Sequence, residues 1–288
     1  MDVGAARDAL TALIGLGAGT LSGLFGVGGG VLSQPGMRAL GIEPLVVIGS
    51  ALPVIIPGAV SGAVRYSRES LVRWPAVWAT VPAGLVFAVL GGVAGEHVPG
   101  DGHLLQIATA LLLGLSAWRM AKVRSPMPPD EPLAETDAPE APQPRVPSTR
   151  GSAGADSVSQ EPDAATLRRR YLSIGALAGG LSGLLGIGGG VVMVPAFVQA
   201  ARMDVKQAIA TSLVCVGAYA VPGTITHVLL GHVDWRVVGA LVLGAVPGAR
   251  FGAVLTIRID EDRLRPVVAA FLAVTAVIYF TGELLAVL

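Results

Sequence analysis

One motif occurs twice in this chain, at corresponding places in its two halves. Residues 21–30 read L-S-G-L-F-G-V-G-G-G and residues 181–190 read L-S-G-L-L-G-I-G-G-G, and each copy lies within a long apolar stretch. Such a self-match predicts two structural repeats. In membrane proteins, paired glycine-rich interruptions in corresponding segments indicate a binding site between the repeats. We therefore expect a site where the two glycine runs meet.

Composition predicts that the chain lies in a lipid bilayer. It is 52% apolar and 14% charged, whereas a soluble domain carries roughly 25% charged residues. Residues 1–8 lack a basic region and no small-residue cleavage site follows, so we expect no signal peptide. Crossing a bilayer takes roughly 20 apolar residues. Stretches of about that length or longer are 9–37, 44–64, 74–95, 103–121, 171–200, 206–230, 235–257 and 264–286.

The predicted fold is an all-α membrane protein made of two repeats, residues 1–121 and 170–288. Each repeat has a glycine-broken first segment, re-entrant or discontinuous, followed by about three transmembrane helices. Residues 122–169 lie between them and are rich in Pro, Ala, Ser and acidic residues, without apolar periodicity. Because such a segment buries too little apolar surface to offset its ordering entropy, we predict a disordered cytoplasmic linker.

The cations near the segment ends favour repeats of opposite orientation, since Lys and Arg accumulate on the cytoplasmic side of a membrane. If each first segment crosses fully, ten of these cations lie on one side and six on the other. If it enters and turns back, thirteen lie on the side of the linker and three lie opposite, namely Arg7, Arg38 and Arg236. The stronger bias predicts inverted repeats in the inner (plasma) membrane, with the linker in the cytoplasm and both termini outside.

The glycine runs predict a break in each first segment, with an anion site beside it. Each glycine costs about 1 kcal/mol relative to alanine within a helix, and Pro35 and Pro195 follow the runs. We expect unwinding at 27–30 and 187–190, with a short helix after each. Unpaired backbone inside a bilayer is tolerated where it lines a cavity, and helix N-termini bind anions. The predicted ligands are Gly28, Gly29, Gly30, Gly188, Gly189 and Gly190.

Polar side chains near the runs extend the candidate site. Neutral hydroxyls lie in Gly49-Ser50 and Thr211-Ser212, which occupy corresponding places, and one arginine lies inside an apolar run. The further candidates are Ser33, Gln34, Ser50, Thr211, Ser212 and Arg250. Two alternatives stay open, because hydroxyls often bond their own helix and the arginine can snorkel to a segment end. Helix packing is the expected role of Gly19, Gly23, Gly179 and Gly183.

The doubled L-S-G-L-[F/L]-G-[V/I]-G-G-G element, followed by a proline and surrounded by apolar segments, resembles the sulfite exporter TauE/SafE family, also called the toluene sulfonate uptake permease family. The likeness covers residues 9–121 and 170–288. It implies transport of a small sulfur-containing anion such as sulfite, thiosulfate, sulfoacetate or another sulfonate, in either direction. It does not select among these anions. The long Pro-rich linker departs from the common pattern of the family.

Two other classes compete with a secondary transporter, namely an uncoupled anion channel and a membrane scaffold without transport. Flux that cannot concentrate the anion against its gradient would favour the channel. The sequence holds neither H-E-x-x-H nor G-x-S-x-G and no paired intramembrane carboxylates, so we expect no enzyme activity, cofactor or metal. The lone cysteine, Cys215, excludes an intrachain disulfide. The expected partners are a small anion and the bilayer, without nucleic acid; the coupling ion and the oligomeric state stay open.

Overall fold

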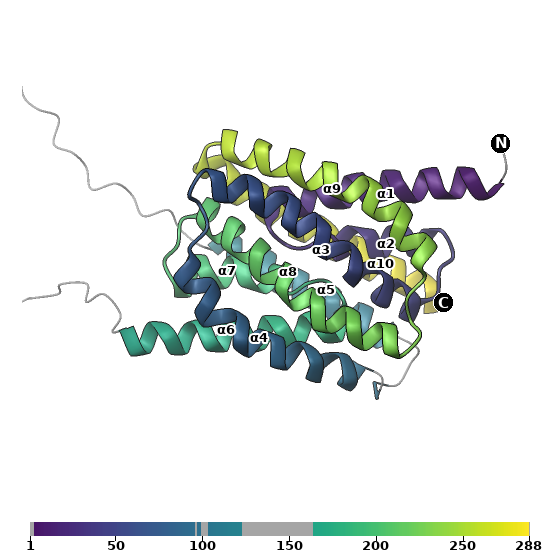
Figure 1. Ribbon diagram of the computed structural model, residues 1–288, viewed down its shortest axis with the longest axis horizontal. Helices are drawn as coiled ribbons and strands as arrows, with labels where there is room; N and C mark the ends of the chain where they lie inside the picture. The colour runs from purple at the N-terminus through teal and green to yellow at the C-terminus, as the bar shows by residue number, and fades with distance from the viewer. Residues whose placement is uncertain (1–2, 96, 99–102, 123–163, 288) are drawn as a thin grey trace, which may run out of the picture.

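The computed structural model describes residues 3–95, 97–98, 103–122 and 164–287, and this part of the chain contains ten α-helices and no strand (Figure 1). The helices of the first half are α1 (Val3–Phe25), α2 (Gly30–Ala39), α3 (Pro44–Arg68), α4 (Trp74–Gly95) and α5 (His103–Lys122). Those of the second half are α6 (Ala164–Leu185), α7 (Gly190–Ala200), α8 (Val205–Leu229), α9 (Trp235–Arg258) and α10 (Glu261–Val287). The all-helical prediction is confirmed for these residues.

Six of the described helices, α1, α3, α4, α8, α9 and α10, are long and apolar enough to cross a membrane. Each rises about 1.5 Å per residue, so roughly 20 residues match the hydrocarbon thickness of a bilayer. The outer faces of these helices carry large apolar side chains, since Trp78 is 71% exposed and Leu243 is 76% exposed. An outer surface of this kind is suited to contact with lipid rather than water.

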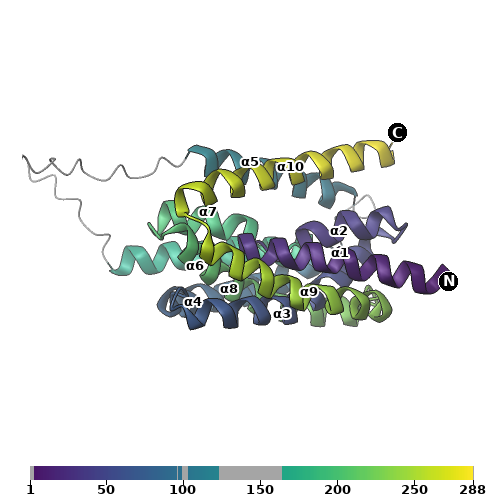
Figure 2. The same cartoon turned by 90° about the horizontal axis from the view of Figure 1, so that it is seen from above.

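α1 and α2 form a helical hairpin with the first glycine run at its tip. α1 ends at Phe25 and α2 begins at Gly30. α2 then returns along α1, because Gly36 faces the side chain of Ile14. Figure 2 shows α2 beside α1, on the side of the molecule where the N-terminus lies.

α6 and α7 form a corresponding hairpin around the second glycine run. The rings of Tyr171 and Phe197 meet edge to face, with 6.2 Å between their centroids. Arg170 Nη1 donates to the carbonyl oxygen of Ala200 at 2.9 Å. These contacts join the first turns of α6 to the later part of α7, so α7 also returns along the helix before it.

The two hairpins enter the molecule from opposite ends. Figure 1 places both termini at one end, and the end of α5 with the start of α6 at the other. At the end with the termini, Arg236 Nη2 pairs with Asp8 Oδ2 at 3.0 Å. At the opposite end, Gln199 Nε2 of α7 donates to the carbonyl oxygen of Arg119 in α5 at 3.0 Å. The glycine tips therefore approach each other from opposite sides.

Helices from the two halves of the chain interleave. α1 packs along α9, α6 packs along α4, and α3 packs against α8 between them. α5 pairs with α10 on one side of this layer, as Figure 2 shows. Each glycine-tipped hairpin thus rests on a helix of the other half. The largest fully buried side chains include Tyr66 of α3, Tyr219 of α8 and Phe25 at the end of α1.

Rows of glycine bring the backbones of these helix pairs into direct contact. On the face of α1 toward α9, a Cβ would overlap the α9 backbone at Gly15, Gly19 and Gly23. On the face of α6 toward α4, a Cβ would overlap the α4 backbone at Gly175, Gly179 and Gly183. Small residues at this spacing are typical of close helix packing in membranes. The packing role predicted for Gly19, Gly23, Gly179 and Gly183 is confirmed.

Most of the segment predicted to be a linker lies outside the described residues, which omit 123–163. Its two edges are helical. α5 includes Lys122, and α6 begins at Ala164, so residues 164–169 belong to a helix and their assignment to the linker was wrong. Ala and Leu have high helix propensity, which explains why the helix starts before the apolar stretch does.

Candidate functional site

The structure brings the two glycine runs together at the tips of the hairpins. A Cβ added at Gly188 would lie 3.6 Å from the Cα of Gly28, and one added at Gly28 would lie 3.5 Å from the Cα of Gly188. The φ angles of these two residues are +86° and +87°, in the left-handed region that side chains rarely adopt. Gly30 and Gly190 also face the backbone of the opposite run. The close approach depends on the absence of side chains.

Open space lies beside Gly29. This residue is buried, has an ordinary helical φ of −65°, and would carry a Cβ without meeting another atom within 4 Å. Gly189 occupies the matching position in the second run but has a φ of +70°, and the carbonyl of Ala178 fills the space beside it. The two halves of the glycine site are therefore unequal, with free space for an added Cβ beside Gly29 but not beside Gly189.

Ser33 contributes a hydroxyl to the same side of α2. Its backbone N–H donates to the carbonyl oxygen of Gly29 at 3.1 Å, so the two residues are one turn apart and share a helix face. Ser33 is 1% exposed, and its Oγ has no hydrogen-bond partner. Leaving a buried hydroxyl unpaired costs about 1–3 kcal/mol, which is compatible with a position that a ligand or water satisfies. The positive end of the α2 dipole lies beside it.

Gln34 is bonded to the protein at both ends of its amide. Nε2 donates to the carbonyl oxygen of Leu185 at 2.9 Å, and Oε1 accepts from the hydroxyl of Tyr279 at 3.1 Å. Leu185 is the last residue of α6, directly before the second glycine run. Gln34 thus joins α2, α6 and α10 beside that run. Gln34 therefore helps to hold the run in place with one of its two amide N–H donors.

Ser50 and Thr211 support the starts of two other helices rather than the glycine runs. Ser50 Oγ accepts from the backbone N–H of Asp234, where α9 begins, at 2.9 Å. Thr211 Oγ1 accepts from the backbone N–H of Arg73, where α4 begins, at 3.0 Å. These bonds show that Ser50 corresponds to Thr211. The predicted pairing of Gly49-Ser50 with Thr211-Ser212 placed Ser50 opposite Ser212, which is one residue too far along the chain. Because α7 has 11 residues and α2 has 10, equivalent residues that follow these helices are one position further apart than the glycine runs are, and this spacing pairs Ser50 with Thr211.

Ser212 contacts the first glycine run, and apolar side chains cover the place where the first and second glycine runs meet. Its Oγ lies 2.9 Å from the carbonyl oxygen of Gly26 and 2.9 Å from that of Ile209 in its own helix, and the single hydroxyl proton is shared between these two acceptors. A Cβ at Gly188 would lie 2.8 Å from Val216 Cγ1 and 3.2 Å from Ile55 Cδ1. The runs are thus closely packed against each other in this conformation.

Arg250 lies away from the glycine runs. It is exposed on the outer face of α9, next to Phe251, which is 63% exposed. α9 ends at Arg258, about 12 Å further along the helix. A long side chain at this depth can extend its guanidinium toward the membrane surface. The snorkelling interpretation of Arg250 accounts for this position, whereas a place in the anion site does not.

Sequence reasoning missed Ser182, which lies beside the second run. Its Oγ is fully buried and has no hydrogen-bond partner. Ser182 is one turn after Ala178 on α6, and Ala178 is the residue whose carbonyl faces Gly189. The serine of the repeated L-S-G motif was the available signal. Among the described residues, no three His, Cys, Asp or Glu side chains gather in a way that could hold a metal ion.

The long apolar helices and lipid-suited surface define a multi-pass membrane protein, and the meeting of two glycine-tipped hairpins gives it an internal candidate site. The family model for the sulfite exporter TauE/SafE matches residues 11–279, and the chain belongs to this family. The resemblance drawn from the doubled motif is confirmed.

Curated relatives carry names of the same kind. The chain is 28% identical to the "Probable membrane transporter protein YunE" of Bacillus subtilis, over 85% of this chain and 82% of the relative. It is 25% identical to a "Probable membrane transporter protein" of Xylella fastidiosa, over 77% and 73% of the two chains. It is 30% identical to the "Probable membrane transporter protein MamO" of Paramagnetospirillum magneticum, over 76% of this chain and 34% of that longer protein. No solved structure matches the chain. Family and relatives indicate a membrane transporter.

Proposed function

We propose that the protein is a secondary transporter of a small sulfur-containing anion, such as sulfite, thiosulfate, sulfoacetate or another sulfonate. The anion binds at mid-membrane where the two glycine runs meet, on the side of Gly29 and Ser33. The observation that carries this proposal is the buried open space beside Gly29, next to an unpaired hydroxyl and the N-terminus of α2. Amide and hydroxyl donors bind an oxyanion without a fixed positive charge. We assign the protein no catalytic role.

We further propose that the two halves are inverted repeats. The matching helix contacts support this, because α1 packs on α9 as α6 packs on α4. The hydrogen bonds from Ser50 to the start of α9 and from Thr211 to the start of α4 support it as well, since each crosses to the other half in the same way. Repeats related in this manner place equivalent hairpins on opposite sides of the membrane centre.

The proposed orientation puts the linker in the cytoplasm of the cell, with the protein in the plasma membrane. Described cations gather at the end where α5 finishes and α6 starts, and they support this orientation through the positive-inside rule. They are Arg65, Arg68, Arg73, Arg119, Lys122, Arg168, Arg169, Arg170, Arg202, Lys206, Arg258, Arg263 and Arg265. The opposite end holds Arg7, Arg38 and Arg236.

Transport requires a change in the contact between the runs. Ile55 and Val216 cover the Gly188 side, and each run presses against the backbone of the other. An anion that contacts both runs must therefore separate them. Relative movement of the two hairpins opens the space beside Gly29 first to one side and then to the other, which is alternating access around a central site.

The decisive variant is Gly29→Leu. Gly29 has a helical φ and open space at the Cβ position, so a side chain here strains the backbone little, and leucine would occupy the proposed anion position. We expect loss of uptake into proteoliposomes for sulfite, thiosulfate, sulfate and small sulfonates, with membrane insertion retained. Gly189→Leu is a poorer test, since its φ of +70° strains any side chain.

The matched control is Gly17→Leu, at an exposed position of α1 where a Cβ would also meet no atom within 4 Å. It should transport like the wild type. Transport by Gly29→Leu at the wild-type rate would refute the proposed site. If neither an imposed proton gradient nor an imposed cation gradient concentrates any of these anions, despite measurable flux, the result would favour the uncoupled channel instead.

A further inference from the structure

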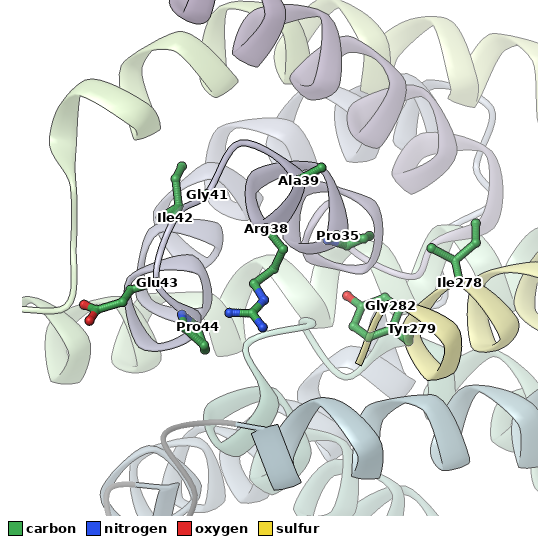
Figure 3. Close-up of a pocket in the computed structure, with 10 residues that line it drawn as sticks. All are labelled: Pro35, Arg38, Ala39, Gly41, Ile42, Glu43, Pro44, Ile278, Tyr279 and Gly282. Atoms are coloured by element: carbon green, nitrogen blue, oxygen red, sulfur yellow. The ribbon is translucent and has the colours of Figure 1, made fainter. Parts of the chain in front are cut away.

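The outer face of the α1–α9 pair carries an apolar groove of about 530 Å³. It arises from the close helix contact, because Gly244 brings the α9 backbone against the carbonyl of Ala12 and leaves a furrow between the larger side chains on either side. Its lining includes Ala12, Leu13, Leu16, Leu243, Gly244 and Pro247. The pocket at the end of α2 differs in character, since Figure 3 shows the charged side chains of Arg38 and Glu43 on its wall. The α1–α9 groove therefore suits a purely apolar chain.

Arg250 lies on the same face of α9 as this groove. It follows Pro247 by three residues and Leu243 by seven, which is the spacing of neighbours along one helix face, and all three are exposed. α9 contains no Asp or Glu, and the single carboxylate of α1, Asp8, pairs with Arg236 at 3.0 Å. Among the described residues, none forms a hydrogen bond or an ion pair with Arg250. Its charge is thus open to a partner in the surrounding lipid.

The position of Arg250 along α9 fits a phosphate at its guanidinium and an acyl chain in the groove. Its Cα is about 12 Å from the end of α9 at Arg258, which places it within the hydrocarbon of a membrane that α9 spans. A charge at such a depth is costly without a partner, and the long side chain can extend toward the headgroups at that end. The groove begins at Pro247, about 5 Å from Arg250 along the helix, whereas the hydrocarbon of one leaflet is about 15 Å thick. The acyl chain of a lipid held at Arg250 is therefore long enough to enter the groove.

We propose that Arg250 and the α1–α9 groove form a binding site for one anionic phospholipid, such as phosphatidylglycerol, from the leaflet at the end where α9 finishes. The guanidinium donates to the phosphate oxygens, for which its planar set of donors is suited, and one acyl chain lies in the groove. A zwitterionic lipid carries its own cation beside the phosphate, so it gains less from Arg250. The bound lipid covers the furrow between α1 and α9, whichever anion the protein transports.

Native mass spectrometry of the purified protein tests the headgroup contact without any transport measurement. Dioleoyl phosphatidylglycerol or dioleoyl phosphatidylcholine is added in detergent at increasing concentration, and the dissociation constant of the first bound lipid is measured. We expect phosphatidylglycerol to bind more tightly. Arg250→Gln should raise its dissociation constant about tenfold, the change expected for the loss of one charge-assisted hydrogen bond. Arg169→Gln, which removes an exposed cation of α6 at the same end, should leave that constant unchanged.

Ala12→Phe tests the groove itself. Ala12 is half-buried and lines the groove, so phenylalanine occupies the furrow, and dioleoyl phosphatidylglycerol should bind about tenfold more weakly, which corresponds to the loss of contact for about two methylene groups. Dihexanoyl phosphatidylglycerol, whose chains are too short to fill the groove, should bind the variant and the wild type equally. The matched control is Gly17→Phe, at an exposed position of α1 outside the groove where a Cβ would meet no atom within 4 Å. It should bind both lipids like the wild type.

Two results would overturn the proposal. One is equal binding of the two dioleoyl lipids by the wild type, or phosphatidylglycerol binding that Arg250→Gln leaves unchanged, because Arg250 would then contact only the general headgroup region. The other is a dimer in the native spectra that Ala12→Phe converts to monomers, since this face would then join two copies of the chain. Where Arg250→Gln does not yield monodisperse protein, the comparison of dioleoyl with dihexanoyl lipid in Ala12→Phe decides alone.

Discussion

Replacing Ser33 with alanine should weaken anion binding and stabilise the empty protein at the same time. Ser33 Oγ is buried without a hydrogen-bond partner, and an unsatisfied buried hydroxyl costs about 1–3 kcal/mol. Alanine removes that hydroxyl and leaves space for one small atom. We therefore expect the free energy of unfolding to stay unchanged or to rise by about 1 kcal/mol. An ordinary structural serine would give the opposite sign.

The anion should lose one hydrogen bond in the same variant. A hydrogen bond to a charged group contributes about 1.5–3 kcal/mol, so the dissociation constant should rise roughly tenfold or more. Thermal unfolding of the purified protein in detergent measures the first effect, and the concentration dependence of thiosulfate uptake in proteoliposomes measures the second. The stabilisation that thiosulfate gives to the wild type should also shrink in Ser33→Ala.

Ser212→Ala is the matched control for this experiment. Ser212 is equally buried, but its Oγ shares its proton between the carbonyl oxygens of Gly26 and Ile209, each at 2.9 Å. Its removal should lower the free energy of unfolding by about 1 kcal/mol. A Ser33→Ala protein that unfolds more easily and transports with unchanged half-saturation would refute the reasoning, because Ser33 would then be a packing residue.

Three further outcomes follow from the fold and the charge pattern. Gly19→Leu should abolish the folded protein, since a Cβ there overlaps the α9 backbone, whereas Gly17→Leu should leave the yield of folded protein in size-exclusion chromatography unchanged. Equal yields of the two variants would contradict the packing role of the glycine row on α1. Because the proposed orientation places the C-terminus outside the cell, a C-terminal alkaline phosphatase fusion should be active and a C-terminal fluorescent protein fusion should be dark. The reverse pattern would contradict the proposed orientation. Deleting residues 128–162, which lack apolar periodicity, should spare transport, and a well-inserted but inactive deletion protein would argue against a passive linker.

The helices and the place of the glycine breaks could be predicted from the sequence because both are local properties. Apolar length determines which segments can cross a bilayer, and three consecutive glycines disfavour helix. The ends of α1 and α6 at Phe25 and Leu185 lie within two residues of the predicted unwinding at Val27 and Ile187. The starts of α2 and α7 at Gly30 and Gly190 are one residue from the prediction.

The roles of individual polar residues could not be predicted, because they depend on partners far away in the sequence. Nothing near Gln34 in the sequence indicates that its side-chain amide forms hydrogen bonds with Leu185 and Tyr279. Ser50 likewise has the local sequence of a pore-lining hydroxyl, yet it bonds the start of α9. Of the hydroxyls named as candidates, Ser33 alone is left without a partner among the described residues.

The cross-connections of the hairpins restrict which parts can move during transport. The first run is held by Ser212 of the second half, and the second run is held through Leu185 by Gln34 of the first half. The glycine rows of α1 and α6 leave no room for sliding against α9 and α4, because their backbones already touch. For the proposed transport, we therefore expect the interleaved pairs α1–α9 and α6–α4 to move as bodies, rather than the two halves of the sequence. Such movement breaks the hydrogen bond from Gln34 to Leu185, which joins the two hairpins, and leaves both glycine rows intact.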